Sequence, residues 1–106
     1  MKTLAAKLFA TTLLLSAIAF ATPATLTGTV SDTMCKGKHM IPGKSPAECA
    51  RACVKDGAKW ALVTNGKVYV LSGNMAALSR AAGKRVTITG EVMGNNVKVS
   101  TITDVQ

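Results

Sequence analysis

Hydrophobic and polar positions alternate along several segments of the chain, and the alternation predicts β-strands. In Thr25–Asp32, the positions Leu26, Gly28 and Val30 share one face, and threonine or serine occupies much of the other. Arg85–Met93 repeats the pattern. A period of two places successive side chains on opposite faces of a strand. Both segments are therefore expected to be half-buried strands. In the first, Gly28 indicates a bend or a close approach of two backbones.

Two short apolar segments, 60–64 and 67–72, flank Asn65-Gly66, the dipeptide most typical of a two-residue β-hairpin turn. This turn fixes the pairing of the two strands. One hairpin face then carries four large apolar side chains, those of Trp60, Leu62, Tyr69 and Leu71. The other face is apolar too, so both faces are expected to be covered. The face with the two aromatics is a candidate ligand face, although such side chains also pack in cores.

The start of a helix is marked clearly at Ser45. Serine is a favoured N-cap, Pro46 suits the first helical position, and Glu48 stands three residues after the cap, where it completes a capping box. The helix is expected to continue to about Asp56, with Gly57 as its C-terminal stop.

A second short helix is predicted over Met75–Ala82, with Asn74 as its cap. The last strand, 97–105, changes phase, which predicts a β-bulge near Ser100–Thr101. The order of elements predicts a mainly β fold, a five-stranded OB-like barrel. We expect one helix between strands three and four, and an inserted segment with a cysteine-bearing loop and a helix between strands one and two.

The N-terminal segment 1–21 is typical of a signal peptide. It begins with a short basic region, continues with the apolar run 8–20, and ends in Ala19-Phe20-Ala21, a small-x-small cleavage pattern. The apolar run is too short for a membrane span. We therefore expect a secreted or periplasmic protein with a single OB-like domain over 22–106 and no membrane span after cleavage.

The inserted segment, 33–57, carries all three cysteines and the only histidine of the chain. Cys49 and Cys53 are one helical turn apart on the predicted helix, at Cβ positions about 5–6 Å apart, which is too far for an unstrained disulfide. Two thiolates at this spacing can still bind one metal ion. Cys35 and His39 have the same four-residue spacing, so the sequence predicts a Cys3His site for one zinc or copper ion.

Two other interpretations of the cysteines remain open. An oxidising compartment favours disulfides, and Cys35 can pair with Cys49 or Cys53 to staple the loop to the helix. The third thiol is then left over. Alternatively, Lys36, Lys38 and Lys44 near a thiol can favour its thiolate and permit redox chemistry, although the C-x-x-C spacing of thiol oxidoreductases is absent. Other enzyme chemistry is disfavoured, because the five acidic residues are spread along the chain.

The chain is basic, with a formal net charge of +8. After removal of 1–21, which contains two of the lysines, a clear positive charge remains. This favours an anionic partner or simply keeps the protein soluble. Nucleic acid is a disfavoured partner, because Trp60 and Tyr69 are the only aromatic residues after position 21.

Four segments carry a family resemblance: TLTGTVSDTMCKGKHM, SPAECARACVKDGAKWALV, GKVYVLSGN and AAGKRVTITGEV. Together they cover most of the chain after residue 21. The chain resembles a family of small secreted bacterial proteins that consist of a domain of unknown function. The resemblance implies export and highlights the cysteines and His39, but it implies no activity and no ligand.

Overall fold

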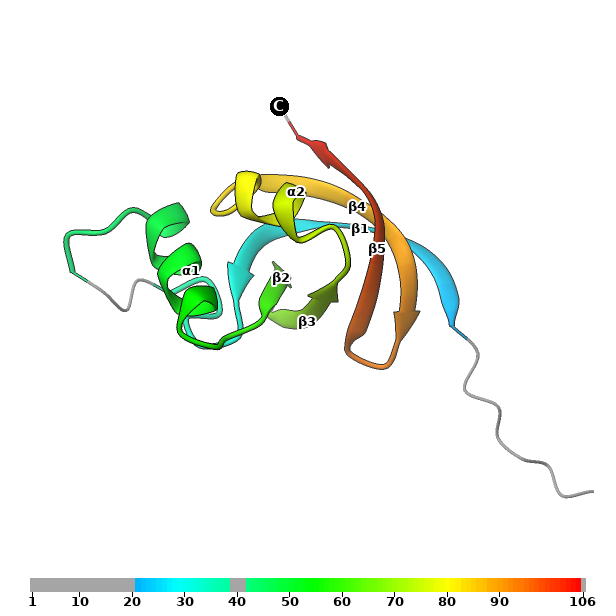
Figure 1. Cartoon of the computed structure of the whole chain (residues 1–106). Helices are drawn as coiled ribbons and strands as arrows, with labels where there is room; N and C mark the ends of the chain where they lie inside the picture. Colours follow the sequence, from blue (N-terminus) through cyan, green and yellow to red (C-terminus); the bar gives the residue numbers. More distant parts are fainter. Residues whose placement is uncertain (1–20, 39–41, 106) are drawn as a thin grey trace, which may run out of the picture.

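A computed structural model describes residues 21–38 and 42–105 of the chain, which form a closed five-stranded barrel (Figure 1). The predicted signal peptide lies outside the described residues except for Ala21. The strand order around the barrel is β1-β2-β3-β5-β4. The strands are β1 (Thr22–Asp32), β2 (Trp60–Thr64), β3 (Lys67–Ser72), β4 (Arg85–Met93) and β5 (Asn96–Asp104). Helix α1 (Pro46–Lys55) lies between β1 and β2 in the chain, and α2 (Met75–Arg80) lies between β3 and β4. The predicted OB-like barrel is confirmed.

The long first strand closes the barrel by pairing with two neighbours. Its first part pairs antiparallel with β4, and its last four residues, Thr29–Asp32, pair antiparallel with β2. β3 and β5 run parallel. A Cβ atom on Gly28 would lie 2.5 Å from the carbonyl oxygen of Val63. Only glycine therefore allows the backbones of β1 and β2 to approach this closely, as the sequence predicts.

The apolar faces of the strands meet inside the barrel. The core includes Leu62 and Ile88 from the strands and Leu78 from α2, each at most 1% exposed. Helix α2 therefore contributes to the barrel core, although it is only six residues long. Burial of these side chains provides most of the driving force for folding.

Most predicted boundaries are confirmed, but β1 begins at Thr22 rather than at Thr25, and the second helix differs in two details. The register of β4 and β5 shifts between Thr89 and Gly90, which leaves Ser100 outside the ladder and confirms the bulge. The second helix ends at Arg80 rather than Ala82. Asn74 is the N-cap residue of α2, as predicted, but it is in the left-handed conformation (φ 47°) and its side chain makes no capping hydrogen bond. Its backbone carbonyl accepts from the amide of Leu78 instead.

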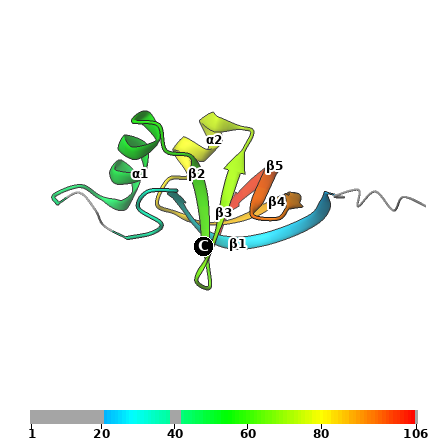
Figure 2. The same ribbon diagram turned by 90° about the horizontal axis from the view of Figure 1, so that it is seen from below.

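Helix α1 lies beside the barrel, next to the end of β1 (Figures 1 and 2). The predicted capping box is present: Ser45 accepts from the amide of Glu48, and Glu48 accepts from the amide of Ser45. Arg51 donates to the carbonyl of Ser79 at 3.0 Å, which ties α1 to α2. The helix is thus fixed in position as well as in length.

Candidate metal centre

Three buried sulfur atoms lie together between the end of β1 and helix α1. The Sγ atom of Cys35 is 3.1 Å from that of Cys49 and 3.3 Å from that of Cys53. All three lie within 4.8 Å of one another, and the side chains are only 2–7% exposed. They form a small cluster of their own, with Ala58 packed against it, separate from the barrel core. The sequence-predicted cysteine set is thus brought together.

Cys49 and Cys53 reach the cluster because α1 is regular at this point. They stand one turn apart on its buried side together with Ala50. Residues four apart on a helix share one face, so both thiols point the same way. After the helix, the amide of Ala58 donates to the carbonyl of Cys53 at 2.9 Å, which fixes the chain as it turns toward β2.

Cys35 reaches the cluster through a turn built on Asp32. One oxygen of Asp32, Oδ1, accepts hydrogen bonds from the amides of Met34 and Cys35, each 2.8 Å long. The carbonyl of Asp32 accepts from the amide of Lys36. Lys36 and Gly37 then adopt left-handed backbone conformations, with φ of 50° and 83°. An aspartate that accepts from amides two and three residues on is a common turn device.

Asp32 is the residue beside the candidate site that the sequence analysis did not single out. Its side chain is fully buried, and its second oxygen, Oδ2, has no hydrogen-bond partner among the residues that the structure describes. Buried carboxylates are normally paired or bound to a metal. The available signal was an aspartate at the end of a strand, three residues before a cysteine.

Burial and the neighbouring groups favour the protonated forms of Cys35 and Cys53. Burial raises the pKa of Cys35 well above its usual range, and hydrogen bonds with the other two cysteines and interactions with Asp32 raise it further. The hydrogen bond with Cys35 lowers the pKa of Cys53, but burial and the charge of Asp32 outweigh it, so that the pKa is raised. A reactive thiol needs a lowered pKa. The redox interpretation therefore receives no support here.

A narrow crevice connects the sulfur cluster with the surface. Its volume is about 40 Å³, and its lining includes Cys35, Cys49, Lys38 and Gly83. A single water needs about 10–15 Å³ of such space, so the crevice admits a water or a small ion.

Two further sequence predictions concern residues elsewhere. His39, the predicted fourth ligand, lies outside the described residues. The candidate ligand face contributes largely to the barrel core: Trp60, Leu62 and Leu71 are at most 3% exposed, and Tyr69 is half-buried against the same core. Edges of Trp60 and Leu71 still border a hollow of about 380 Å³ near Met75.

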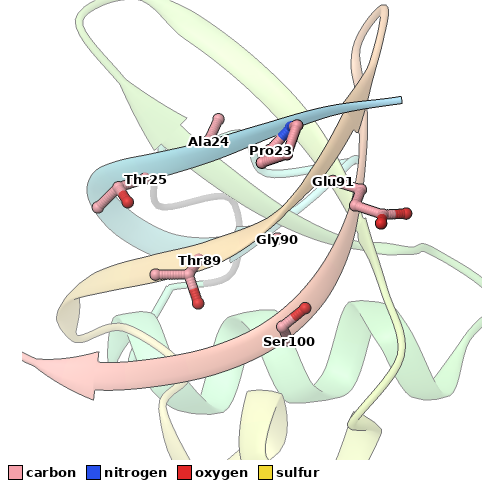
Figure 3. Close-up of a pocket in the computed structure, with 7 residues that line it drawn as sticks. All are labelled: Pro23, Ala24, Thr25, Thr89, Gly90, Glu91 and Ser100. Atoms are coloured by element: carbon pink, nitrogen blue, oxygen red, sulfur yellow. The ribbon is translucent and has the colours of Figure 1, made fainter. Parts of the chain in front are cut away.

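A second hollow lies along β1, β4 and β5 (Figure 3). It measures about 460 Å³ and surrounds the bulge at Gly90, with Thr25, Thr89 and Ser100 along it. Glu91 is the one ionisable side chain in its lining. It holds no cluster of nucleophilic or metal-binding groups, so the chemistry of the described chain is concentrated at the cysteines.

Comparison of the chain with protein-family models, with curated proteins and with solved structures found no match. The family resemblance therefore stays a prediction. No helix in the described part of the chain has the length and apolar character needed to cross a membrane.

Proposed function

We propose that the protein is an exported, non-enzymatic module that binds one zinc or copper ion through Cys35, Cys49 and Cys53. The observation that carries the proposal is the convergence of three buried sulfur atoms within 4.8 Å of one another. Thiolates are preferred ligands of both zinc and copper(I). The signal-peptide pattern and the family resemblance support export.

A metal ion requires only a small adjustment of the cluster. Zinc–sulfur bonds of about 2.3 Å in tetrahedral geometry place the sulfur atoms about 3.8 Å apart. The Sγ atom of Cys35 is 3.1 and 3.3 Å from those of Cys49 and Cys53. Each of these two distances would have to increase by a fraction of an ångström. His39 remains the proposed fourth ligand, four residues after Cys35.

A disulfide-stapled module with an anionic partner is the second candidate function, and one observation favours it. Cys35 contacts two other thiols, so oxidation can join it to Cys49 or to Cys53. Either bond would link the β1 end to α1 and leave one cysteine over. Such a crosslink stabilises small exported domains by about 2–4 kcal/mol.

Native mass spectrometry separates the two candidates. The protein is exported to its natural compartment, purified without chelator, and weighed both native and denatured, with thiols counted after denaturation. The proposal expects one zinc or copper ion per chain and three reactive thiols. A chain without metal, two hydrogens lighter and with one thiol, would overturn it.

A matched pair of variants localises the ion. Cys49→Ser should abolish stoichiometric binding, whereas Ala52→Ser, on the same helix, should retain it. Ala52→Ser introduces the same serine into α1 but leaves all three sulfur atoms in place. Equal loss in both variants would indicate damage to the helix rather than removal of a ligand.

A further inference from the structure

Asp32 places a buried carboxyl group beside the sulfur cluster. Its side chain is fully buried, and Oδ1 is held by two backbone amides, so the carboxylate cannot turn away without losing both hydrogen bonds. Oδ1 lies 2.8 Å from the backbone nitrogen of Cys35, whose Sγ atom is 3.1 and 3.3 Å from those of Cys49 and Cys53. The carboxylate is therefore fixed directly beside the residue that joins the three sulfur atoms.

The second oxygen of this carboxylate lacks a compensating group. Oδ2 is buried and has no hydrogen-bond partner within residues 21–38 and 42–105. The nearby lysines Lys36, Lys38 and Lys59 are exposed, where water screens their charge. A cation held by the three buried cysteines would lie in the same buried region as the carboxylate, where water screens charges much less. This relationship points to a cation at the cluster.

We propose that Asp32 makes the three-cysteine site prefer a divalent ion, zinc, over copper(I). The inference rests on the proposed function and names the metal that the proposed function leaves open. Asp32 acts as a specificity-determining residue through its charge. Its oxygen atoms need not ligate the metal, and they are not among the ligand atoms that lie within 4.8 Å of one another.

The preference follows from the net charge of each loaded site. Three thiolates around a zinc ion leave one negative charge, whereas the same thiolates around copper(I) leave two. Asp32 repels the copper-loaded site more strongly. The cost of deprotonating the three thiols is common to both ions and cancels in the ratio of their affinities. The ratio of affinities therefore depends on how strongly the Asp32 carboxylate repels one additional negative charge at the buried site. We expect this repulsion to change the ratio by about tenfold or more.

The decisive variant is Asp32→Asn. Asparagine has nearly the same shape and retains a carbonyl oxygen for the amides of Met34 and Cys35, but it has no charge. Zinc and copper(I) dissociation constants are measured separately for the reduced protein under anaerobic conditions, against competing chelators. We expect the ratio of the two constants to shift toward copper(I) by about tenfold or more. Glu91→Gln, which removes an exposed carboxylate on β4, should leave the ratio unchanged.

The outcomes distinguish this inference from the proposed function. If the unaltered protein binds neither ion, the proposed function fails and this inference with it. If the protein binds metal and Asp32→Asn changes both affinities by the same factor, or changes neither, only this inference is overturned. A purely structural role of the Asp32 turn gives such an equal change. If Asp32→Asn does not fold, Asp32→Ser, whose hydroxyl also accepts from backbone amides, is measured in its place.

Discussion

The Sγ atom of Cys35 lies 3.1 Å from that of Cys49, although one residue follows strand β1 and the other belongs to helix α1. Any group that joins these two sulfur atoms joins the helix to the barrel. The contact also spans the segment 39–41, which the structure does not describe. Binding at the cluster and stability of the inserted segment are therefore expected to be coupled.

The first prediction concerns that coupling. Zinc at about one hundred times its dissociation constant should stabilise the reduced protein by about 2.7 kcal/mol, because it binds the folded state. Thermal unfolding with zinc and then with excess chelator measures the change. Cys35→Ser should lose the zinc-dependent stabilisation, whereas Thr103→Ser, at an exposed site on β5, should keep it. Equal stabilisation of both variants by zinc would contradict binding at the cluster.

The second prediction concerns pH. Folding raises the pKa of Cys35 above its ordinary value of 9.0, mainly through burial. The folded state thus favours the neutral thiol, so this contribution to stability is present below about pH 9 and is lost as the pH rises further. Denaturant unfolding of the metal-free, reduced protein at about pH 8 and about pH 10 should show a decrease.

Two controls separate the thiol effect from general alkaline effects. Cys35→Ser retains every lysine but lacks the buried thiol, so its stability should fall less between the same pH values. In the metal-loaded protein the cysteines are already thiolates, so its stability should also fall less between these pH values. A decrease of the same size in Cys35→Ser would show that the lysines, and not Cys35, cause the pH dependence.

The third prediction tests the fourth ligand. His39→Ala should weaken zinc binding by about 10- to 100-fold if the imidazole completes a tetrahedral site. Lys38→Ala, an exposed neighbour, should change the affinity by less than about threefold, because a screened surface charge contributes little. Chelator competition measures both. Equal affinities in His39→Ala and the unaltered protein would remove His39 from the site.

The sequence predicts the barrel well because each strand carries its own local signal. Alternation marks β4, Asn65-Gly66 marks the hairpin, and Ser45 with Glu48 marks α1, and the structure confirms all three. The helical period alone predicts that Cys49 and Cys53 lie on one face of α1. These features depend on residues close together in the chain.

The position of Cys35 could not be predicted in the same way. It depends on the turn that Asp32 builds with its side chain and on the docking of α1 against the barrel. Both are tertiary effects that no local period encodes. The same holds for Asn74, where the chain adopts a left-handed conformation and the backbone, rather than the side chain, begins the helix.

The docking of α1 gives the last prediction, at Gly83. This glycine has φ +76°, and a Cβ atom there would lie 2.8 Å from the backbone nitrogen of Ala47 in the first turn of α1. Gly83→Ala should therefore force α1 away from the barrel. We expect a loss of about 1–2 kcal/mol from the left-handed conformation and a further 1–3 kcal/mol from the steric clash.

Gly43→Ala is the matched control for this substitution. Gly43 has a similar φ of +81°, and no atom of the residues that the structure describes lies within 4 Å of the added Cβ, so Gly43→Ala should lose only the conformational part. The difference in free energy of unfolding between the two variants isolates the contact of α1 with the barrel. Cys49 and Cys53 belong to α1 and would move with it. The zinc affinity of Gly83→Ala should therefore be lower than that of the unaltered protein, whereas the zinc affinity of Gly43→Ala should be unchanged. Equal zinc affinities would show that the sulfur cluster assembles without this contact, and that the metal itself can hold the helix in place.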